Sequence, residues 1–322
     1  MSDVARPILA LSGGVGGAKL ALGLADILAP GRLHVLVNTA DDFNHLGLHI
    51  SPDIDTLVYT LAGLANREQG WGLQGETWQA LDALRQLGAE TWFQLGDRDL
   101  ATHLWRTQKL QQGLTLSEIT SEMASCLGIS SRICPMSNDA VRTIVSTTNG
   151  ELPFQQYFVR ERCDPAVSGF RFDGITEAQV NPDVWARLQQ DAFAAIVVCP
   201  SNPFVSIDPI LQLPGLRQAL LDTPSPVALV SPIVGGSAIK GPAAKMMSEL
   251  GLASSAVAVA QHYSQVYPGL IDHFVIDETD ATLADDVREM NLDVAVTDTI
   301  MKTREDKQRL ARFILNLTQV AH

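Results

Sequence analysis

Short apolar runs alternate with longer amphipathic stretches along most of the chain. The runs that are richest in apolar residues lie at 8–11, 33–37, 195–199, 227–230, 273–276 and 294–296. Such short runs, without internal alternation, are typical of strands covered on both faces, and helical spacing fills most of the stretches between them. The pattern predicts an α/β fold: a Rossmann-like, doubly wound and mostly parallel sheet.

The segment between about 54 and 172 follows a different pattern. Helical spacing predicts helices over 54–65, 77–87, 100–111 and 116–127. From 140 to 172, including Phe154, Tyr157 and Val159, residues alternate as in strands, which predicts a small β hairpin region. Because no Ser/Pro-rich linker or repeat interrupts the chain, we expect one domain over 1–322 with a helical and β insertion at about 54–172.

Polar and glycine-rich segments follow the predicted strands directly. They occupy 12–17, 38–42, 200–203 and 231–236, with shorter ones after 276 and 296. The carboxyl ends of parallel strands meet at one edge of the sheet, where open α/β sheets bind their ligands. The pattern therefore predicts a ligand site at this edge, although some of the segments would serve equally as turns.

The first of these segments has the chemistry of a phosphate-binding loop. Its residues without a Cβ atom are Gly13, Gly14, Gly16 and Gly17. They allow a tight turn and close approach to a ligand, the following helix offers free N–H groups, and Lys19 adds a positive charge. Lys19 stands where a dinucleotide fingerprint has its third glycine, and no Gly-Lys-Ser/Thr ends the loop. We expect nucleotide phosphates here; the alternative is a tight turn without a ligand.

An acidic cluster follows the second predicted strand. Its members are Asp41, Asp42, Asp53 and Asp55. Carboxylate oxygens suit Mg²⁺, which takes one or two carboxylates together with phosphate oxygens and water. We interpret Asp53 largely as a helix cap or local structure, since it stands at the start of a predicted helix. Asp41, Asp42 and Asp55 are candidates for metal or substrate contacts.

Other polar residues stand at predicted strand and helix ends. Arg98 would hold a phosphate or pair with a neighbouring aspartate, and His103 lies one helical turn beyond Asp99, although a lone helical histidine is more often structural. The remaining binding candidates are Ser201, Asn202, Ser231, Gly235, Gly236 and Lys240. No Ser–His–Asp or cysteine nucleophile motif is present, so the chemistry would rest on a metal and on positioning.

Composition narrows the choice of partners. The formal net charge is −13, so a duplex nucleic acid is not an expected partner. Four cysteines without metal-ligand spacing are typical of reduced thiols in a cytoplasmic protein. No apolar run reaches the roughly 18 residues of a membrane span.

Taken together, these motifs resemble one family, the 2-phospho-L-lactate transferases of coenzyme F420 assembly. The resemblance is carried by SGGVGGAK at 12–19, NTADD at 38–42, SPDIDT at 51–56, LGDRDLATH at 95–103, SNP at 201–203, and SPIVGG at 231–236 with KGP at 240–242. These segments extend over nearly the whole chain, and their combination is specific although each alone is weak.

The resemblance implies a Mg²⁺-dependent, cytoplasmic and usually dimeric enzyme. It would move a phospholactyl, phosphoenolpyruvyl or phosphoglyceryl group from a GDP-linked donor to the terminal hydroxyl of the deazaflavin Fo, releasing GMP. Asp55 fits the family position that contacts the deazaflavin, and Thr39 belongs to the expected substrate-binding set. Gln94 stands where the family has a lysine, which removes a cation but leaves a hydrogen-bonding side chain.

Phosphoryl transfer to a hydroxyl requires neutralised phosphates, in-line positioning and activation of the hydroxyl. We expect Mg²⁺ on Asp41 and Asp42, with Asp55 orienting or deprotonating the acceptor and Asp42 as the second catalytic candidate. Two alternatives are a non-catalytic nucleotide-sugar-binding regulator with a similar glycine-rich start and an NAD(P)-dependent dehydrogenase. The dehydrogenase is disfavoured because the fingerprint glycine is displaced.

Overall fold

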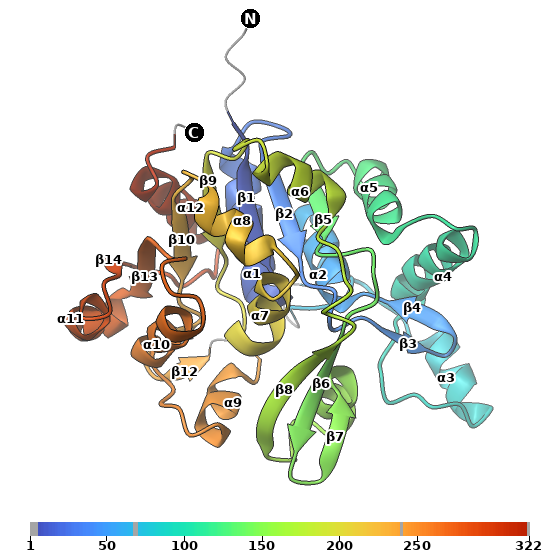
Figure 1. Cartoon of the computed structure of the whole chain (residues 1–322). Coiled ribbons are helices and arrows are strands. Elements are labelled where there is room, and N and C mark those ends of the chain that lie inside the picture. Colours follow the sequence, from blue (N-terminus) through green and yellow to red (C-terminus); the bar gives the residue numbers. More distant parts are fainter. Residues whose placement is uncertain (1–5, 67–69, 239–240, 321–322) are drawn as a thin grey trace, which may run out of the picture.

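A seven-stranded parallel sheet forms the centre of the computed structural model, which describes residues 6–66, 70–238 and 241–320 (Figure 1). The strand order is β14-β13-β10-β9-β1-β2-β5. The strands are β1 (Ile8–Ser12), β2 (Leu33–Val37), β5 (Arg132–Pro135), β9 (Ala195–Val198), β10 (Val227–Val230), β13 (His273–Asp277) and β14 (Asp293–Thr297). The predicted doubly wound parallel sheet is confirmed.

Both faces of the sheet are covered, because successive residues of each strand point to opposite sides. In β1, Ile8 and Ala10 enter one core cluster, and Leu9 and Leu11 enter the other. The first cluster is closed by α1 (Gly14–Ile27), α2 (Pro52–Leu61), α5 (Leu116–Cys126) and α12 (Arg304–Leu317). The second is closed by α6 (Pro182–Leu188), η2 (Pro203–Ile207), α7 (Asp208–Leu211), α8 (Leu216–Asp222), α9 (Ala243–Glu249), α10 (Ala256–Val266) and α11 (Ala284–Arg288).

The order of the strands reverses beside β1. From β1 the chain continues to β2 and β5 on one side, whereas β9, β10, β13 and β14 follow in sequence on the other. The point between β1 and β9 is therefore a topological switch point, where the connections leave the carboxyl ends of neighbouring strands in opposite directions.

Smaller elements project from the carboxyl edge of the sheet, on the side away from the chain termini (Figure 1). They include the hairpin of β3 (Phe43–His45) and β4 (Leu48–Ile50), the helices α3 (Gln79–Gln86) and α4 (Asp97–Gln111), and an antiparallel sheet of β6 (Arg142–Thr147), β7 (Gly150–Pro153) and β8 (Val167–Asp173). Shorter still are η1 (Gln156–Arg160), β11 (Ile233–Val234), β12 (Ser237–Ala238) and η3 (Glu278–Leu283).

The predicted helices of this region are present with shifted ends, but two details differ from expectation. The alternation around Tyr157 does not form a strand: Gln156–Arg160 is a short π-helical segment, with Tyr157 in the core. In addition, β5 pairs with β2 in the central sheet, although its four residues gave no distinct apolar run. Among the described residues, no helix is both long enough and apolar enough to cross a bilayer.

Candidate functional site

A cavity of about 710 Å³ opens at the carboxyl edge of the sheet, at the switch point between β1 and β9. Residues that follow β1, β2, β9, β10 and β14 all contribute to its wall. Its polar lining includes Lys19, Asp41, Asp53, Asp55, Gln94, Asp99, His103, Gln155, Ser201, Asn202, Ser206, Ser231, Thr299 and Lys302. The sequence placed a site at this edge, and the structure gathers the segments there.

The glycine loop forms one wall of the cavity. Gly14, the first residue of α1, has a φ of +63° and open space where a Cβ would stand, whereas a Cβ on Gly16 would lie 2.2 Å from the carbonyl oxygen of Pro200. Ser201 ties the loop to the segment after β9, because its hydroxyl donates to the Gly13 carbonyl at 2.7 Å. The glycines are thus required by one left-handed turn and by close packing across the switch point.

The N–H of Gly14 does not face the cavity unpaired. It donates to Asp53 Oδ1 at 2.8 Å. The amide Nδ2 of the fully buried Asn38 donates to Asp53 Oδ2 at 3.0 Å and to Asp41 Oδ2 at 3.1 Å. One side-chain amide therefore joins two carboxylates at the cavity wall.

The pKa values of Asp41 and Asp53 are both raised above the ordinary aspartate value. Burial raises the pKa of Asp53 to about 6, against hydrogen bonds from Asn38 and Gly14 that favour the charged form. Burial, followed by the charge of Asp53, also raises the pKa of Asp41 well above its ordinary value. The other oxygen of Asp41, Oδ1, is buried and makes no hydrogen bond with the described residues. A pair of carboxylates with a spare buried oxygen matches the donor set of a hard divalent cation.

Asp42 lies behind this wall and is not among the lining residues. Its Oδ2 accepts a hydrogen bond from the Ser51 hydroxyl at 2.8 Å and lies 3.1 Å from His49 Nε2. Of the two interpretations of Asp53, as a helix cap or as local structure, the cap is wrong, because no side chain caps α2: Asp53 Oδ1 accepts from Gly14 and Oδ2 from Asn38. Asp53, rather than Asp42, stands beside Asp41 at the cavity.

A second group of charged side chains lies deeper in the same wall. Asp55 forms a bidentate ion pair with the buried Arg106 on α4. The ring of His103 lies between two carboxylates, with Nδ1 3.7 Å from Asp55 Oδ2 and Nε2 3.2 Å from Asp99 Oδ2. Burial raises the pKa of Asp55, and Arg106 opposes that shift.

Asp99 remains the more acidic of these two carboxyls. Burial acts to raise its pKa, but His103 and the Tyr59 hydroxyl, which donates to Asp99 Oδ1 at 2.6 Å, together lower it. Asp55, Asp99 and His103 offer ligand atoms within 4.8 Å of one another, a second arrangement of metal-ligand types. Here, however, the guanidinium of Arg106 already occupies both oxygens of Asp55.

Aromatic side chains line the mouth of the cavity. Trp71 and Phe158 line it while remaining 44% and 38% exposed. Phe154 stacks on Phe158 with ring centroids 5.5 Å apart, and Phe93 also reaches the cavity beside Gln94. Exposed rings next to hydrogen-bonding side chains are suited to a planar aromatic ligand.

Some predicted binding residues stand outside this cavity. They are Gly17, Thr39, Arg98, Gly235 and Gly236. The guanidinium of Arg98 donates to the Gln74 carbonyl, and the Gly235 N–H donates to the carboxylate of Asp280 at 3.0 Å. Lys240 lies outside the described residues.

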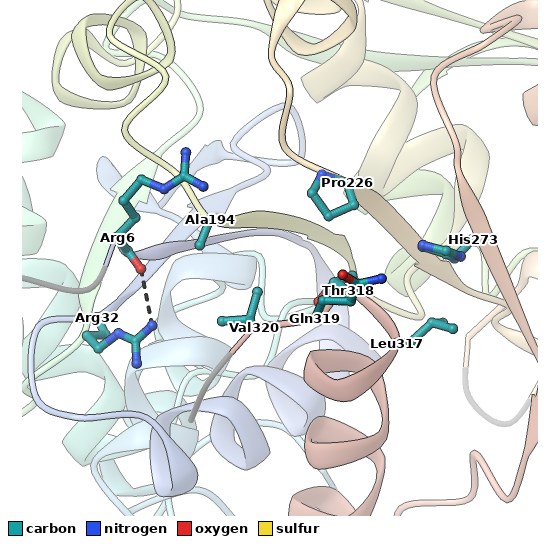
Figure 2. Close-up of a pocket in the computed structure, with 9 residues that line it drawn as sticks. All are labelled: Arg6, Arg32, Ala194, Pro226, His273, Leu317, Thr318, Gln319 and Val320. Carbon is teal, nitrogen blue, oxygen red and sulfur yellow. Dashed lines mark hydrogen bonds between the residues drawn. The ribbon is translucent and has the colours of Figure 1, made fainter.

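A second cavity, of about 470 Å³, lies at the opposite, amino-terminal end of the strands (Figure 2). It is lined by residues that precede or begin strands, such as Arg32 and His273, and by the end of the chain after α12. Its two arginines donate to backbone carbonyls: Arg6 to Asp191 at 3.2 Å and Arg32 to Arg6 at 3.3 Å. No residue that the sequence analysis singled out lines this cavity.

Several residues of the main site were not expected from the sequence. Arg106 was not singled out, Asn38 was named only as part of the segment at 38–42 without a role of its own, and Tyr59 was treated only as part of a helix. The spacing held a signal, since Asp55 and Tyr59 are one turn apart on α2, as Asp99 and His103 are on α4. Nothing in the sequence indicated that these two helices face each other.

The fold and its switch-point cavity define a Rossmann-like α/β protein. A sequence profile described as 2-phospho-L-lactate transferase CofD matches residues 8–314. The chain therefore belongs to the 2-phospho-L-lactate transferase family, and it is an enzyme of the transferase class, from a family that acts in coenzyme F420 biosynthesis.

Individual relatives carry two different names. The 2-phospho-L-lactate transferase of Methanosarcina acetivorans is 38% identical over 310 residues, which cover 96% of this chain and 98% of that protein. The phosphoenolpyruvate transferase of Streptomyces griseus is 37% identical over 317 residues, covering 97% and 98%. Among solved structures, a upf0052 family protein of Bacillus halodurans superposes with a TM-score of 0.66 at 13% identity, covering 97% of this chain and 99% of that one, and supports the fold alone.

Proposed function

We propose that this enzyme transfers a phospho-acyl group from a GDP-linked donor to the terminal hydroxyl of the deazaflavin Fo, with Mg²⁺ as cofactor and GMP as the leaving group. One observation carries the proposal. A single cavity combines a glycine loop, a pair of buried carboxylates and an aromatic mouth, which are the features needed for a diphosphate, a cation and a planar acceptor.

The donor phosphates are assigned to the loop that begins α1. The N-terminus of this helix has no acidic residue in its first turn, and Lys19 from the same helix also lines the cavity. Helix N-termini attract anions through the helix dipole and first-turn amide groups, one of which, the Gly14 N–H, here donates to Asp53, and a lysine adds a positive charge. Ser201, Asn202 and Ser231 line the side beyond β9 and would contact the remainder of the nucleotide.

The cation is assigned to Asp41 and Asp53. Their oxygens share the Asn38 amide, and Asp41 Oδ1 has no hydrogen-bond partner among the described residues. When bound there, Mg²⁺ would neutralise phosphate charge during the transfer. Asp42, expected as a ligand from the sequence, would instead support this wall through Ser51 and His49.

The acceptor is assigned to the aromatic mouth and to Asp55. Rings such as Trp71 and Phe158 would stack on the deazaflavin, and Gln94 would hydrogen-bond its edge. Both oxygens of Asp55 are held by Arg106, which favours an orienting role over that of a base. In the transfer, the acceptor oxygen forms a new P–O bond, the anhydride bond to GMP breaks, and the hydroxyl loses its proton.

Purified enzyme incubated with Fo, Mg²⁺ and each of three GDP-linked donors tests this function. The donors carry phospholactate, phosphoenolpyruvate or phosphoglycerate, and mass spectrometry should show a phospho-acylated Fo and GMP with at least one of them. Tight binding of sugar nucleotides without turnover of Fo would favour the regulatory alternative instead. We further propose a cytoplasmic homodimer, and light scattering that gives the mass of a single chain would contradict the dimer.

A further inference from the structure

Arg106 is the largest side chain that the fold buries completely. Its exposure is 0%, and it stands on α4 behind the cavity wall without lining the cavity itself. A guanidinium loses much hydration when it is buried, so its partners must compensate that loss. The hydrogen-bond partners of the guanidinium show which residues compensate for this lost hydration.

The two terminal nitrogens of Arg106 make its polar contacts, and two of the three partners, Asp55 and His103, line the cavity, whereas the buried Nε makes no hydrogen bond to the described residues. Its two terminal nitrogens hold both oxygens of Asp55, with Nη1 3.1 Å from Oδ2. The same Nη1 lies 3.3 Å from His103 Nδ1 and 3.4 Å from the carbonyl oxygen of His49. Arg106 therefore joins α4 to α2 and to strand β4 at one point.

The contact with His103 determines which ring nitrogen carries hydrogen. An arginine only donates hydrogen bonds, so a hydrogen bond across this 3.3 Å contact requires His103 Nδ1 to be the accepting, unprotonated nitrogen. In the neutral ring, the hydrogen then resides on Nε2, which lies 3.2 Å from Asp99 Oδ2 without making a hydrogen bond to any of the described residues. Arg106 thus holds the Asp55 carboxylate directly and contacts the His103 ring, whose other nitrogen faces Asp99.

We propose that Arg106 is a positioning residue of the transfer reaction. It aims the Asp55 carboxylate at the acceptor and fixes His103 as the Nε2–H tautomer against Asp99. This inference rests on the proposed function, in which Asp55 contacts the acceptor. Arg106 touches neither substrate, so its effect reaches the reaction only through Asp55 and His103.

Side-chain ¹⁵N NMR of the full-length chain tests the tautomer without any substrate. The resonances are assigned by their loss in His103→Gln. The wild-type protein should show a protonated Nε2 and an unprotonated Nδ1, and Arg106→Met should lose this preference. A protonated Nδ1 in the wild-type protein at neutral pH would overturn the inference whether or not the enzyme uses Fo.

Kinetics with Fo test the positioning. Arg106→Met should lower kcat/KM for Fo by about 100-fold, within the range usual for a lost orienting interaction, and leave the Kd of GDP within about twofold. Arg106→Lys keeps the charge but lacks the fork, so it should recover only part of the loss. Equal losses for acceptor turnover and GDP binding would show a purely structural role.

Two further variants keep this test decisive. Lys109→Met removes a cation from the same helix. Lys109 does not line the cavity, and its Nζ lies 2.9 Å from Glu122 Oε1, so this variant should match the wild type. In the Asp55→Asn background the contact with His103 remains, so Arg106→Met should cost clearly less than in the wild type; a full second loss there would contradict action through Asp55. If the wild-type enzyme fails to turn over Fo, the proposed function falls, while the NMR result still decides the tautomer.

Discussion

Replacing Asp53 by asparagine tests the electrostatics of the cavity wall most directly. Asp53 is a buried carboxylate that accepts hydrogen bonds from Gly14 and Asn38, and its pKa lies at about 6 because of burial. The substitution keeps the shape of the side chain and removes the charge. One amide oxygen can still accept the Gly14 N–H, but the new NH₂ group then faces the NH₂ of Asn38.

The sign and size of the effect follow from the pKa shift. Between the ordinary aspartate pKa of 3.8 and the folded-state pKa of about 6, the folded state binds more protons than the unfolded state. The free energy of unfolding of the wild-type protein therefore falls as the pH rises through this window. At roughly 1.36 kcal/mol per pKa unit, the loss that Asp53 causes is about 3 kcal/mol. The mispaired amide costs about 1–3 kcal/mol at every pH.

The assay is urea unfolding with a chelator present, from pH 4 to pH 8. Relative to the wild type, Asp53→Asn should be less stable near pH 4 and should gain about 3 kcal/mol of relative stability by pH 7. Mg²⁺ should stabilise the wild-type protein at pH 7 but not the variant. Asp285→Asn, which changes an exposed carboxylate, is the control with no such pH dependence. A constant difference between wild type and Asp53→Asn across this range would refute the reasoning.

Three further substitutions test the separate parts of the proposed site. In steady-state kinetics, Lys19→Met should raise KM for the GDP-linked donor about tenfold through loss of a charged contact and leave KM for Fo unchanged. A raised KM for Fo with an unchanged KM for the donor would show that Lys19 contacts the acceptor instead. Trp71→Ala should raise KM for Fo by up to about tenfold, as expected for a lost stacking contact, and fluorescence titration with unchanged Fo affinity would argue against the aromatic mouth. Gln94→Lys should tighten Fo binding if this side chain meets the acceptor, and an unchanged Kd would place it elsewhere.

Much of the fold was predictable because its pattern is local. Five strands of the central sheet are buried over nearly their whole length, and the edge strand β14 still contains the run 294–296, so these six apolar runs stand out against the polar segments that follow them. The seventh, β5, has only Ile133 and Cys134 between an arginine and a proline, and only its pairing with β2 makes it a strand. For the segment around Tyr157 the pattern predicted a strand that does not exist. Its residues alternate as in a strand, but the chain forms a π-helical turn there.

The site residues that directly follow strands were predictable from the sequence. The residues that reach the site through contacts between helices were not. The glycine loop, Asp41 and Ser201 follow their strands directly and reach the cavity as expected. Asp53 was misassigned because its position at a helix start is usual for a cap, whereas its partners come from two distant segments. Arg106 gave no signal because its role arises only where α4 packs against α2.

The contact between Asp53 and Gly14 links the two ends of the donor site. The Gly14 N–H at the start of α1, where we propose that a donor phosphate binds, already donates to a carboxylate of the protein at 2.8 Å. In the proposed donor complex, a phosphate at this amide would displace Asp53, and a cation between Asp41 and Asp53 would draw that carboxylate away while neutralising the phosphate. Donor and Mg²⁺ should therefore bind cooperatively, because each removes the obstacle to the other.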